Sequence, residues 1–262
     1  MPDSLFPKNP KATARLAGLS YLIIIICGIF AQIAVRGTLV DSGDAAATAA
    51  NIHANTTLLG IGVLADFVVY FLDLVLAVAF YRLFAPVNQS LALFAAWLRI
   101  AMTALLFVNL INFAAPLILL GEGRFASQID PEQAEILSLL FLQLHSTGFI
   151  LGLMMFGVYG LMLGYLIIRS GFMPALIGAL VMISGLSYFL MGIIDFVLPD
   201  YRPMINILLI SAALPEFIFT GWLLAVGLNR EKWEARGRPG IIPASRKSAG
   251  SKSRRPARRD DR

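Results

Sequence analysis

Six long blocks of apolar residues dominate the sequence between Arg15 and Arg230. Each block is long enough to cross a hydrocarbon core of about 30 Å. A backbone in hydrocarbon must satisfy its own hydrogen bonds, and unbroken apolar runs lack the alternation of barrel strands. The sequence therefore predicts an all-α fold, a polytopic membrane protein with a six-transmembrane-helix bundle. The predicted spans are Leu16–Val35, Leu58–Tyr81, Leu91–Leu120, Ile136–Ile168, Met173–Leu198 and Met204–Leu228.

The composition supports this class and excludes several others. Of the 262 residues, 58% are hydrophobic and 14% are charged, whereas about 25% are charged in an average soluble domain. One cysteine and two histidines are too few for a disulfide-stapled secreted domain or for a zinc site of several Cys and His ligands. We therefore predict no metal site and no cofactor.

The distribution of Lys and Arg predicts an orientation. Of the 21 Lys and Arg residues, 17 fall on the side that holds both termini and three fall on the other side, while Arg99 lies within a span. Cytoplasmic flanks of membrane proteins are rich in Lys and Arg. We therefore predict that both termini are cytoplasmic.

The chain is expected to have three parts. Residues 1–15 form a cytoplasmic N-terminus, residues 16–228 the six-helix membrane domain, and residues 229–262 a basic, disordered cytoplasmic tail. The tail alternates Arg, Lys, Ser, Gly and Pro, a composition that cannot bury a core. Its charge predicts contact with anionic lipid. No aromatic residue accompanies the charge from Arg246 onwards, so we expect no nucleic-acid binding. The predicted partner is the lipid bilayer. The sequence indicates no protein partner.

Two aspartates mark helix starts on the non-cytoplasmic side. Asp44 precedes an alanine-rich run, and Asp130 precedes Pro131; an Asp side chain can accept from free backbone N–H groups, and proline suits the first helical turn. We therefore expect the fourth span to begin near Pro131.

Glycines also recur at helical spacing in the fourth and fifth spans, which predicts close packing of these two helices. They are Gly148, Gly152, Gly160, Gly164, Gly171, Gly178, Gly185 and Gly192.

Four ionisable residues lie deep inside the predicted spans: Asp66, Asp73, Arg99 and Glu216. A rise of 1.5 Å per residue places Asp73 and Arg99 about 12 Å from the cytoplasmic ends, Glu216 about 18 Å and Asp66 about 22 Å. An unpaired charge at mid-bilayer costs about 2.5–3.5 kcal/mol. We therefore expect these side chains to converge in one cluster and to form a ligand- or ion-binding site.

The charges of this cluster do not balance, because three acids accompany one arginine. Arg99 can serve two carboxylates through its fork of donors. Desolvation and like-charge repulsion then predict that at least one of Asp66 and Glu216 is protonated at neutral pH. Pro215 directly precedes Glu216 and is expected to bend or open the sixth helix there, as in many transporter sites. The alternative is that the Asp–Arg pair only fixes which helices touch.

A secondary polar layer is predicted nearer the outer boundary. Asn112, His145 and Asp195 fall about 31, 34 and 33 Å from the cytoplasmic ends. We expect His145 to hydrogen-bond Asp195 or water. As a less favoured alternative, Asp195 could orient His145 as the general base of an intramembrane enzyme. Ser146 and Thr147 adjoin His145 and so do not face it; we therefore assign no catalytic residues.

Four short segments resemble a known family. They are KATARLAGLSYL at residues 11–22, GDAAATAANI at 43–52, APVNQSLALFAAWLR at 85–99 and LHSTGFILG at 144–152. On these segments the chain resembles a bacterial membrane family known as domain of unknown function 4386, from about Lys11 to Leu228. The resemblance implies a multi-pass six-helix protein of the bacterial cytoplasmic membrane, and it implies no activity, substrate or catalytic residue.

Three functions remain open. The favoured one is proton-linked binding or movement of a small ligand or ion at Asp66, Asp73, Arg99 and Glu216. The second, almost as well supported, is a non-catalytic structural or regulatory membrane scaffold. The third is an intramembrane enzyme, against which the sequence offers no paired nucleophile and no metal signature.

Overall fold

The computed structural model describes residue 7 and residues 9–236. The described part is helical and has no strand, and six helices are long and apolar enough to cross a membrane. The all-α prediction is therefore confirmed, as are the six spans to within a few residues. The spanning elements are α1 (Pro10–Ile29) continued by η1 (Phe30–Arg36) and α2 (Gly37–Leu39), α4 (Thr56–Phe84), α5 (Gln89–Leu119), α6 (Pro131–Ser170), α7 (Ala175–Val197), and η3 (Pro199–Met204) continued by α8 (Ile205–Ala225).

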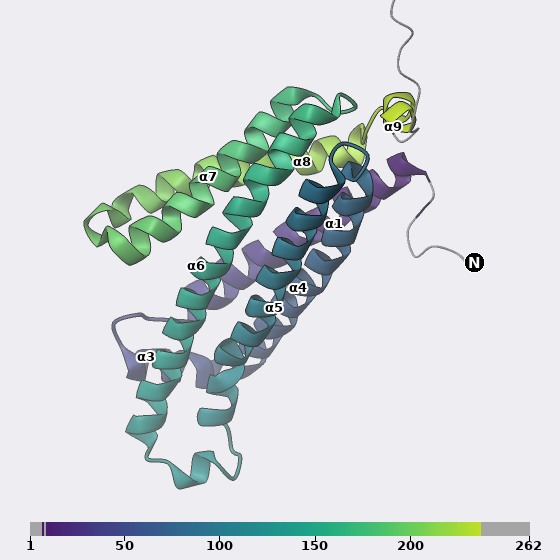
Figure 1. The fold of residues 1–262 in the computed structure, drawn as a ribbon. Helices are drawn as coiled ribbons and strands as arrows, with labels where there is room; N and C mark the ends of the chain where they lie inside the picture. The colour runs from purple at the N-terminus through teal and green to yellow at the C-terminus, as the bar shows by residue number, and fades with distance from the viewer. Residues whose placement is uncertain (1–6, 8, 237–262) are drawn as a thin grey trace, which may run out of the picture.

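The six spans pack in a closed ring, which Figure 1 shows from the side. Each span packs against the next along the chain from α4 to α8, while α1 packs against both α4 and α8. The longest helix, α6, has 40 residues, about 60 Å at 1.5 Å per residue. It packs along α5 on one side and α7 on the other. The α7–α8 hairpin leans away from α5 (Figure 1), while α3 (Ala45–Ala54) packs against α6. We call the two ends of the bundle the α3 end and the α9 end, after the short helices that they carry, α3 and α9 (Arg230–Arg236).

Both predicted helix starts are present. The Asp44 carboxylate accepts from the backbone N–H of Ala47 at the start of α3. The Asp130 carboxylate accepts from the N–H groups of Glu132 and Gln133, and α6 begins at Pro131. A short 3₁₀-helix, η2 (Ala126–Gln128), lies in the loop before it. These caps satisfy donors that the first helical turn leaves free.

Glycines bring α6 and α7 into close contact, as predicted, but Gly148 and Gly152 face Asn109 and Leu106 of α5 instead of α7. A methyl group added at Gly164 would lie 2.5 Å from the Gly178 carbonyl oxygen, and one at Gly157 would lie 2.5 Å from that of Gly185. Only glycine allows the two backbones to approach this closely. Gly171 has a different role, because it ends α6 at φ 71°, in the left-handed region; glycine adopts that conformation without a steric penalty.

The predicted disordered tail begins at residue 229, but residues 230–236 form the helix α9 (Arg230–Arg236). Trp233 holds this helix against the bundle, since its indole Nε1 donates to the Leu83 carbonyl at 2.9 Å. Arg236 donates to the Arg169 carbonyl at 2.6 Å. The sequence interpretation weighed the charge of this segment and missed its one aromatic anchor. The prediction for residues 237–262 falls outside the described residues.

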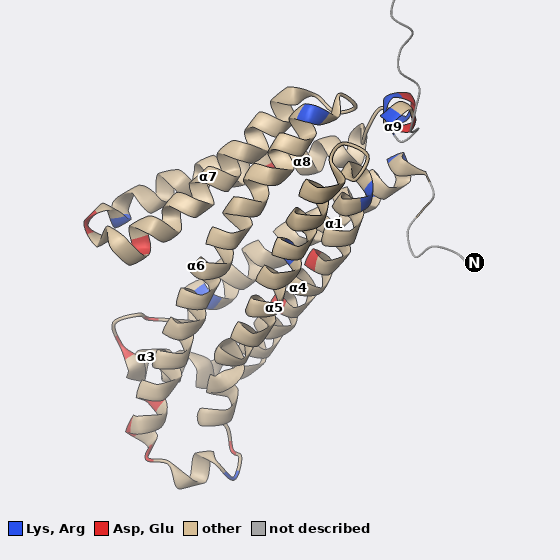
Figure 2. Ribbon diagram, in the orientation of Figure 1, with Lys and Arg blue, Asp and Glu red and all other residues tan. Residues whose placement is uncertain are grey.

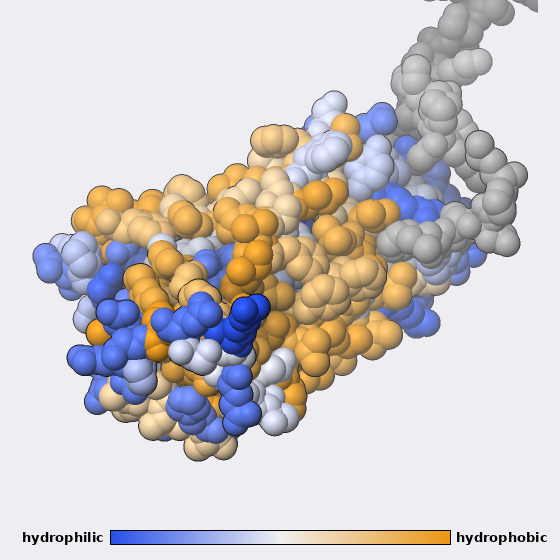
Figure 3. All heavy atoms as spheres, turned by 90° about the horizontal axis from the view of Figure 1, so that it is seen from below, coloured by the Kyte–Doolittle hydropathy of each residue, from blue (hydrophilic) through white to orange (hydrophobic). Residues whose placement is uncertain are grey.

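The charged and apolar residues are separated over the surface. Most Lys, Arg, Asp and Glu residues of the described chain lie in loops and at the two ends of the bundle, and a few lie in the middle of helices (Figure 2). Seen from below, hydrophilic residues gather at the near end and hydrophobic residues cover the flank (Figure 3). Large apolar side chains such as Val108, Ile111 and Ile207 are more than two-thirds exposed. Such flanks suit contact with lipid.

Candidate functional site

Arg99 forms a buried ion pair with Asp73. The guanidinium Nη2 of Arg99 on α5 donates to Oδ1 of Asp73 on α4, and its Nη1 donates to the Tyr21 hydroxyl of α1 at 3.2 Å. Only 1% of Arg99 is exposed. The sequence interpretation brought these two residues together because their helices are consecutive and antiparallel, and the structure confirms the pair.

Three aromatic rings surround the Arg99 guanidinium. Its Cζ lies 4.8 Å from the ring centroid of Tyr159 and 5.3 Å from those of Tyr21 and Phe156. A cation over an aromatic face is stabilised by the ring quadrupole, most strongly when it is desolvated. Arg99 therefore links α1, α4, α5 and α6. We call Tyr21, Asp73, Arg99 and Tyr159 the Arg99 centre.

Glu216 does not join the Asp73–Arg99 pair. Its carboxylate accepts a hydrogen bond of 3.2 Å from the Tyr188 hydroxyl of α7, and it forms no ion pair with any described residue. Glu216 lines a cavity of about 10 Å³ together with Tyr21, Tyr159 and Ser184. The expectation that Arg99 would serve two carboxylates is therefore wrong, although Glu216 shares a cavity with two residues of the Arg99 centre.

Asp66 pairs with Arg36 and not with Arg99. Nη1 of Arg36 donates to Oδ2 of Asp66 at 2.6 Å, and 4% of the Asp66 side chain is exposed. The single predicted cluster is therefore divided into separate centres. The sequence interpretation ended the first span at Val35, which left Arg36 in a loop. The helix instead continues as the π-helix η1. π-Helices are rare overall, and those that occur are often found at functional sites.

His145 lies beside this second pair. Its Nε2 is 3.4 Å from Nη1 of Arg36 and 3.8 Å from Oδ2 of Asp66, while its Nδ1 is 3.2 Å from the backbone carbonyl oxygen of Asn109. The His145 ring also stacks on Phe113 at 4.8 Å between centroids. We call Arg36, Asp66, Asn109 and His145 the Arg36 centre. Sequence reasoning missed Arg36 and Asn109.

The predicted secondary layer is present only in part. Asn112 donates to the Asn109 side chain at 3.0 Å, so it belongs to the surroundings of His145. Asp195 does not, because it pairs with Arg202 at 3.3 Å near the tip of the α7–α8 hairpin. Of the two partners expected for His145, Asp195 or water, Asp195 is therefore excluded. Depth alone placed the two residues together, while α7 leans away from this part of α6 (Figure 1).

Tyr70 lies between the two centres on α4. It is four residues after Asp66 and three before Asp73, a spacing that puts all three side chains on one helical face. Its hydroxyl is buried and has no hydrogen-bond partner among the described residues, and the same is true of the Tyr159 hydroxyl and Arg99 Nε. Buried polar atoms normally have a hydrogen-bond partner. The Tyr70 and Tyr159 hydroxyls and Arg99 Nε therefore remain able to form hydrogen bonds.

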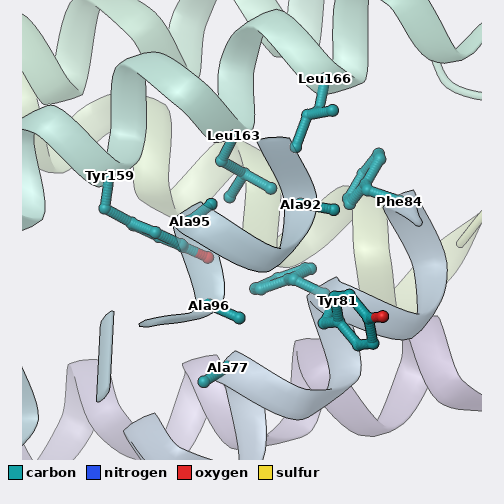
Figure 4. A pocket seen from close by; sticks show the side chains of 10 residues that line it. Ala77, Tyr81, Phe84, Ala92, Ala95, Ala96, Tyr159, Leu163 and Leu166 are labelled. Atoms are coloured by element: carbon teal, nitrogen blue, oxygen red, sulfur yellow. The ribbon is translucent and has the colours of Figure 1, made fainter. Parts of the chain in front are cut away.

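A second cavity lies between α4, α5 and α6 on the side toward the α9 end. Its lining is mainly Ala, Leu and Phe, and the Tyr159 ring extends into it from α6 (Figure 4). This cavity also measures about 10 Å³, which is about the space that a single water molecule needs. Both cavities are thus far below the roughly 300–1,000 Å³ of a small-molecule pocket. Within the described residues, no three His, Cys, Asp or Glu side chains are placed to hold a metal ion.

Comparison with known proteins gives a family match over most of the chain. The family described as Domain of unknown function (DUF4386) matches residues 16–227. A protein from Archaeoglobus fulgidus, named as an uncharacterised protein, is 26% identical over 161 residues, which cover 62% of this chain and 80% of that protein. No solved structure matches the chain.

Proposed function

We propose a function from the premise that this chain belongs to the family described as Domain of unknown function (DUF4386). Its six long apolar helices indicate a multi-pass membrane protein. The proposed function is movement of a small ion across the membrane, with a proton exchanged at Glu216 next to the Arg99 centre.

One observation carries this proposal. Asp73 and Asp66 each have an arginine partner, whereas Glu216 forms no ion pair with any described residue. Ionisable residues without a charged partner at membrane depth are costly and characteristically mark ion pathways and proton relays. The cavity that Glu216 lines together with Tyr21 and Tyr159 also has room for about one water molecule.

The helix that carries Glu216 supports a site that can change shape. Pro215 lies inside α8 directly before Glu216. Proline removes one backbone hydrogen bond and clashes with the preceding turn, so it weakens the helix at this point. α8 nevertheless runs unbroken through Pro215, so the expected opening of the helix is absent and the proline only weakens it. Asp66 and the Arg36 centre would then form the part of the path nearer the α3 end.

The orientation that we propose places the α9 end in the cytoplasm of a bacterial-type plasma membrane. Lys11, Arg15, Arg82, Arg169 and α9 all lie toward this end. Cytoplasmic flanks attract Lys and Arg. The basic segment after α9 would then lie close to anionic lipid headgroups, which attract such sequences.

The test is proton movement in liposomes of known content. The purified full chain is reconstituted, a pH-sensitive dye is enclosed, and gradients of K⁺ or Na⁺ are imposed. We expect the interior pH to change several-fold faster than in empty liposomes, and Glu216→Gln to return the rate to that of empty liposomes. Glu231→Gln, at an exposed residue of α9, is the matched control and should leave the rate unchanged. Equal rates for wild type and empty liposomes, or for wild type and Glu216→Gln, would contradict the proposal.

A scaffold function is the second candidate, and the Arg99 centre favours it. Arg99 of α5 contacts three other helices, α1, α4 and α6, through one ion pair, one hydrogen bond to a tyrosine hydroxyl and three rings. A buried polar contact of this kind can specify which helices pair. Under this candidate the Asp73–Arg99 pair contributes only to folding, and replacing both residues by leucine would leave every other property of the protein intact.

A further inference from the structure

The Arg36 centre brings one histidine into contact with a complete ion pair. Oδ2 of Asp66 is 2.6 Å from Nη1 of Arg36 and 3.8 Å from Nε2 of His145, and Nη1 is 3.4 Å from the same Nε2. One carboxylate oxygen thus faces two groups that can carry positive charge. The His145 and Asp66 side chains are 2% and 4% exposed, whereas the Arg36 side chain is 14% exposed.

Hydrogen-bond donors and acceptors determine the tautomer of His145. The guanidinium of Arg36 has only donors; its Nη1 carries two hydrogens, one for Asp66 and one directed at Nε2. Nε2 must therefore accept, and it carries no hydrogen. A neutral imidazole has one N–H, so the hydrogen is on Nδ1. Nδ1 lies 3.2 Å from the backbone carbonyl oxygen of Asn109, which accepts it, and 3.3 Å from Nδ2 of the Asn109 side chain, whose shorter contact is the 2.8 Å hydrogen bond to the His145 carbonyl oxygen. His145 is thus neutral in this arrangement, and the lone pair of Nε2 points toward the ion pair.

We propose that Nε2 of His145 is a proton-binding site, and that proton binding transfers Asp66 from Arg36 to His145. The proton comes from water at the α3 end, and a new N–H bond forms at Nε2. A protonated Nε2 is a donor, so it can no longer accept from Nη1 of Arg36, and that contact breaks. The new N–H instead has Oδ2 of Asp66 as its acceptor, a change that needs less than 1 Å of approach from the present 3.8 Å.

The surroundings of Arg36 allow it to leave Asp66. Its Nε donates to Gln32 at 2.9 Å, and its Cζ lies 5.0 Å from the Phe113 ring and 5.9 Å from the Phe149 ring. The guanidinium thus keeps a hydrogen bond and aromatic contacts when Asp66 turns away. Arg36 ends a π-helix, and such segments are local departures from the α-helical ladder that proteins use at functional sites.

No other charged group faces His145 among the described residues. Arg36 comes from η1 and Asp66 from α4, while α5 presents Asn109 and Phe113. The remaining neighbour of this part of α6 is α3, whose titratable side chain, His53, is exposed. The protonation of His145 therefore depends on Arg36 and Asp66. This site deepens the proposed path at its α3 end, but its contacts do not include Glu216, so the protonation of His145 and the proton exchange at Glu216 can be tested, and can fail, separately.

The chain is well suited to a direct test because it contains only two histidines. In His53→Gln the nitrogen NMR signals of labelled histidine report on His145 alone, with the full chain in lipid nanodiscs. We expect a neutral ring protonated at Nδ1 near neutral pH, and protonation of Nε2 as the pH is lowered from about 8 to 5. A ring protonated at Nε2 and bare at Nδ1, or no protonation in this range while circular dichroism shows a folded protein, overturns the proposal.

Two further variants test the exchange of partners. At a fixed acidic pH, Asp66→Asn in the same background should lower the ratio of protonated to neutral His145 about tenfold, because the acceptor charge is lost. Arg36→Gln should raise that ratio by a similar factor, because a neighbouring cation is removed. An unchanged ratio in both variants overturns the exchange. If either variant fails to fold, the tautomer in His53→Gln still decides the assignment.

Discussion

Arg36 and Asp66, 30 residues apart in sequence, form an ion pair with a 2.6 Å contact between Nη1 and Oδ2. This pair gives Asp66 its own countercharge and leaves Arg99 to Asp73 alone. Arg36, Asp66, Asp73 and Arg99 thus form two balanced pairs, and Glu216 remains outside both. This arrangement separates the two carboxylates that have an arginine partner from Glu216, the carboxyl group for which we propose proton exchange.

The Asp73–Arg99 pair should show strong energetic coupling. Asp73→Leu leaves a buried arginine without its carboxylate, and Arg99→Leu leaves a buried carboxylate without its arginine. Removing one partner of a buried pair costs about 3–5 kcal/mol, whereas replacing both by apolar residues is often neutral. We therefore expect each single variant to unfold at lower temperature and the double variant to recover most of the loss.

The measurement is thermal unfolding in detergent micelles, followed by circular dichroism, for wild type, both single variants and the double variant. Additive losses in the double variant would contradict the coupling. The double variant also separates the two candidate functions. If it folds but no longer moves protons, the Arg99 centre does more than hold helices together.

The hydrogen bond between Tyr188 and Glu216 should matter more for activity than for stability. Tyr188→Phe removes one donor at 3.2 Å, and a single hydrogen bond contributes about 0.5–1.5 kcal/mol. We expect a small fall in melting temperature but a clear change in the rate of proton movement in liposomes, since Tyr188 provides the hydrogen bond that holds the Glu216 carboxylate. Tyr165→Phe, at an exposed tyrosine of α6, is the control. A rate equal to that of this control would contradict the proposed role of Glu216.

Close packing of α6 against α7 gives a prediction about stability alone. A methyl group added at Gly185 would lie 2.6 Å from the Gly157 carbonyl oxygen, so Gly185→Ala must push the helices apart. Overpacking of this kind costs about 1–3 kcal/mol. Gly28→Ala in α1 is the matched control, because nothing lies within 4 Å of an added methyl group there, and alanine favours a helix interior. The melting temperature should fall for the first variant and stay equal or rise for the second.

Much of the fold could be predicted from the sequence because the membrane restricts it. Apolar length gives the six spans, and Asp44 and Asp130 mark two helix starts. The contact between Asp73 and Arg99 was also predictable, since consecutive antiparallel helices with a short loop must lie side by side and residues at equal depth then meet. These features depend on one helix or on two helices adjacent in sequence.

The Arg36–Asp66 pair and the separation of His145 from Asp195 could not be predicted from the depth of each residue in the membrane. Depth places a residue along the membrane normal and leaves its direction around the helix and the tilt of its neighbours open. Asp195 and His145 share a depth, yet the lean of α7 separates them. Arg36 reaches Asp66 only because the first helix continues through a π-helical segment, which no apolar pattern indicates. One signal was available: Asp66 is nearer in depth to the end of the first span than to Arg99.

The last prediction distinguishes stability from function at Tyr70. Its hydroxyl is buried without a hydrogen-bond partner among the described residues, and an unpaired buried polar group costs about 1–3 kcal/mol. Tyr70→Phe should therefore melt at or above the temperature of wild type. Tyr21→Phe is the contrasting variant and should melt lower, because it removes the 3.2 Å hydrogen bond from Arg99.

If the two centres on α4 form one path, Tyr70→Phe should also slow proton movement in liposomes, since it removes the polar atom between Asp66 and Asp73. A stable Tyr70→Phe variant with an unchanged rate would show that the two centres act separately.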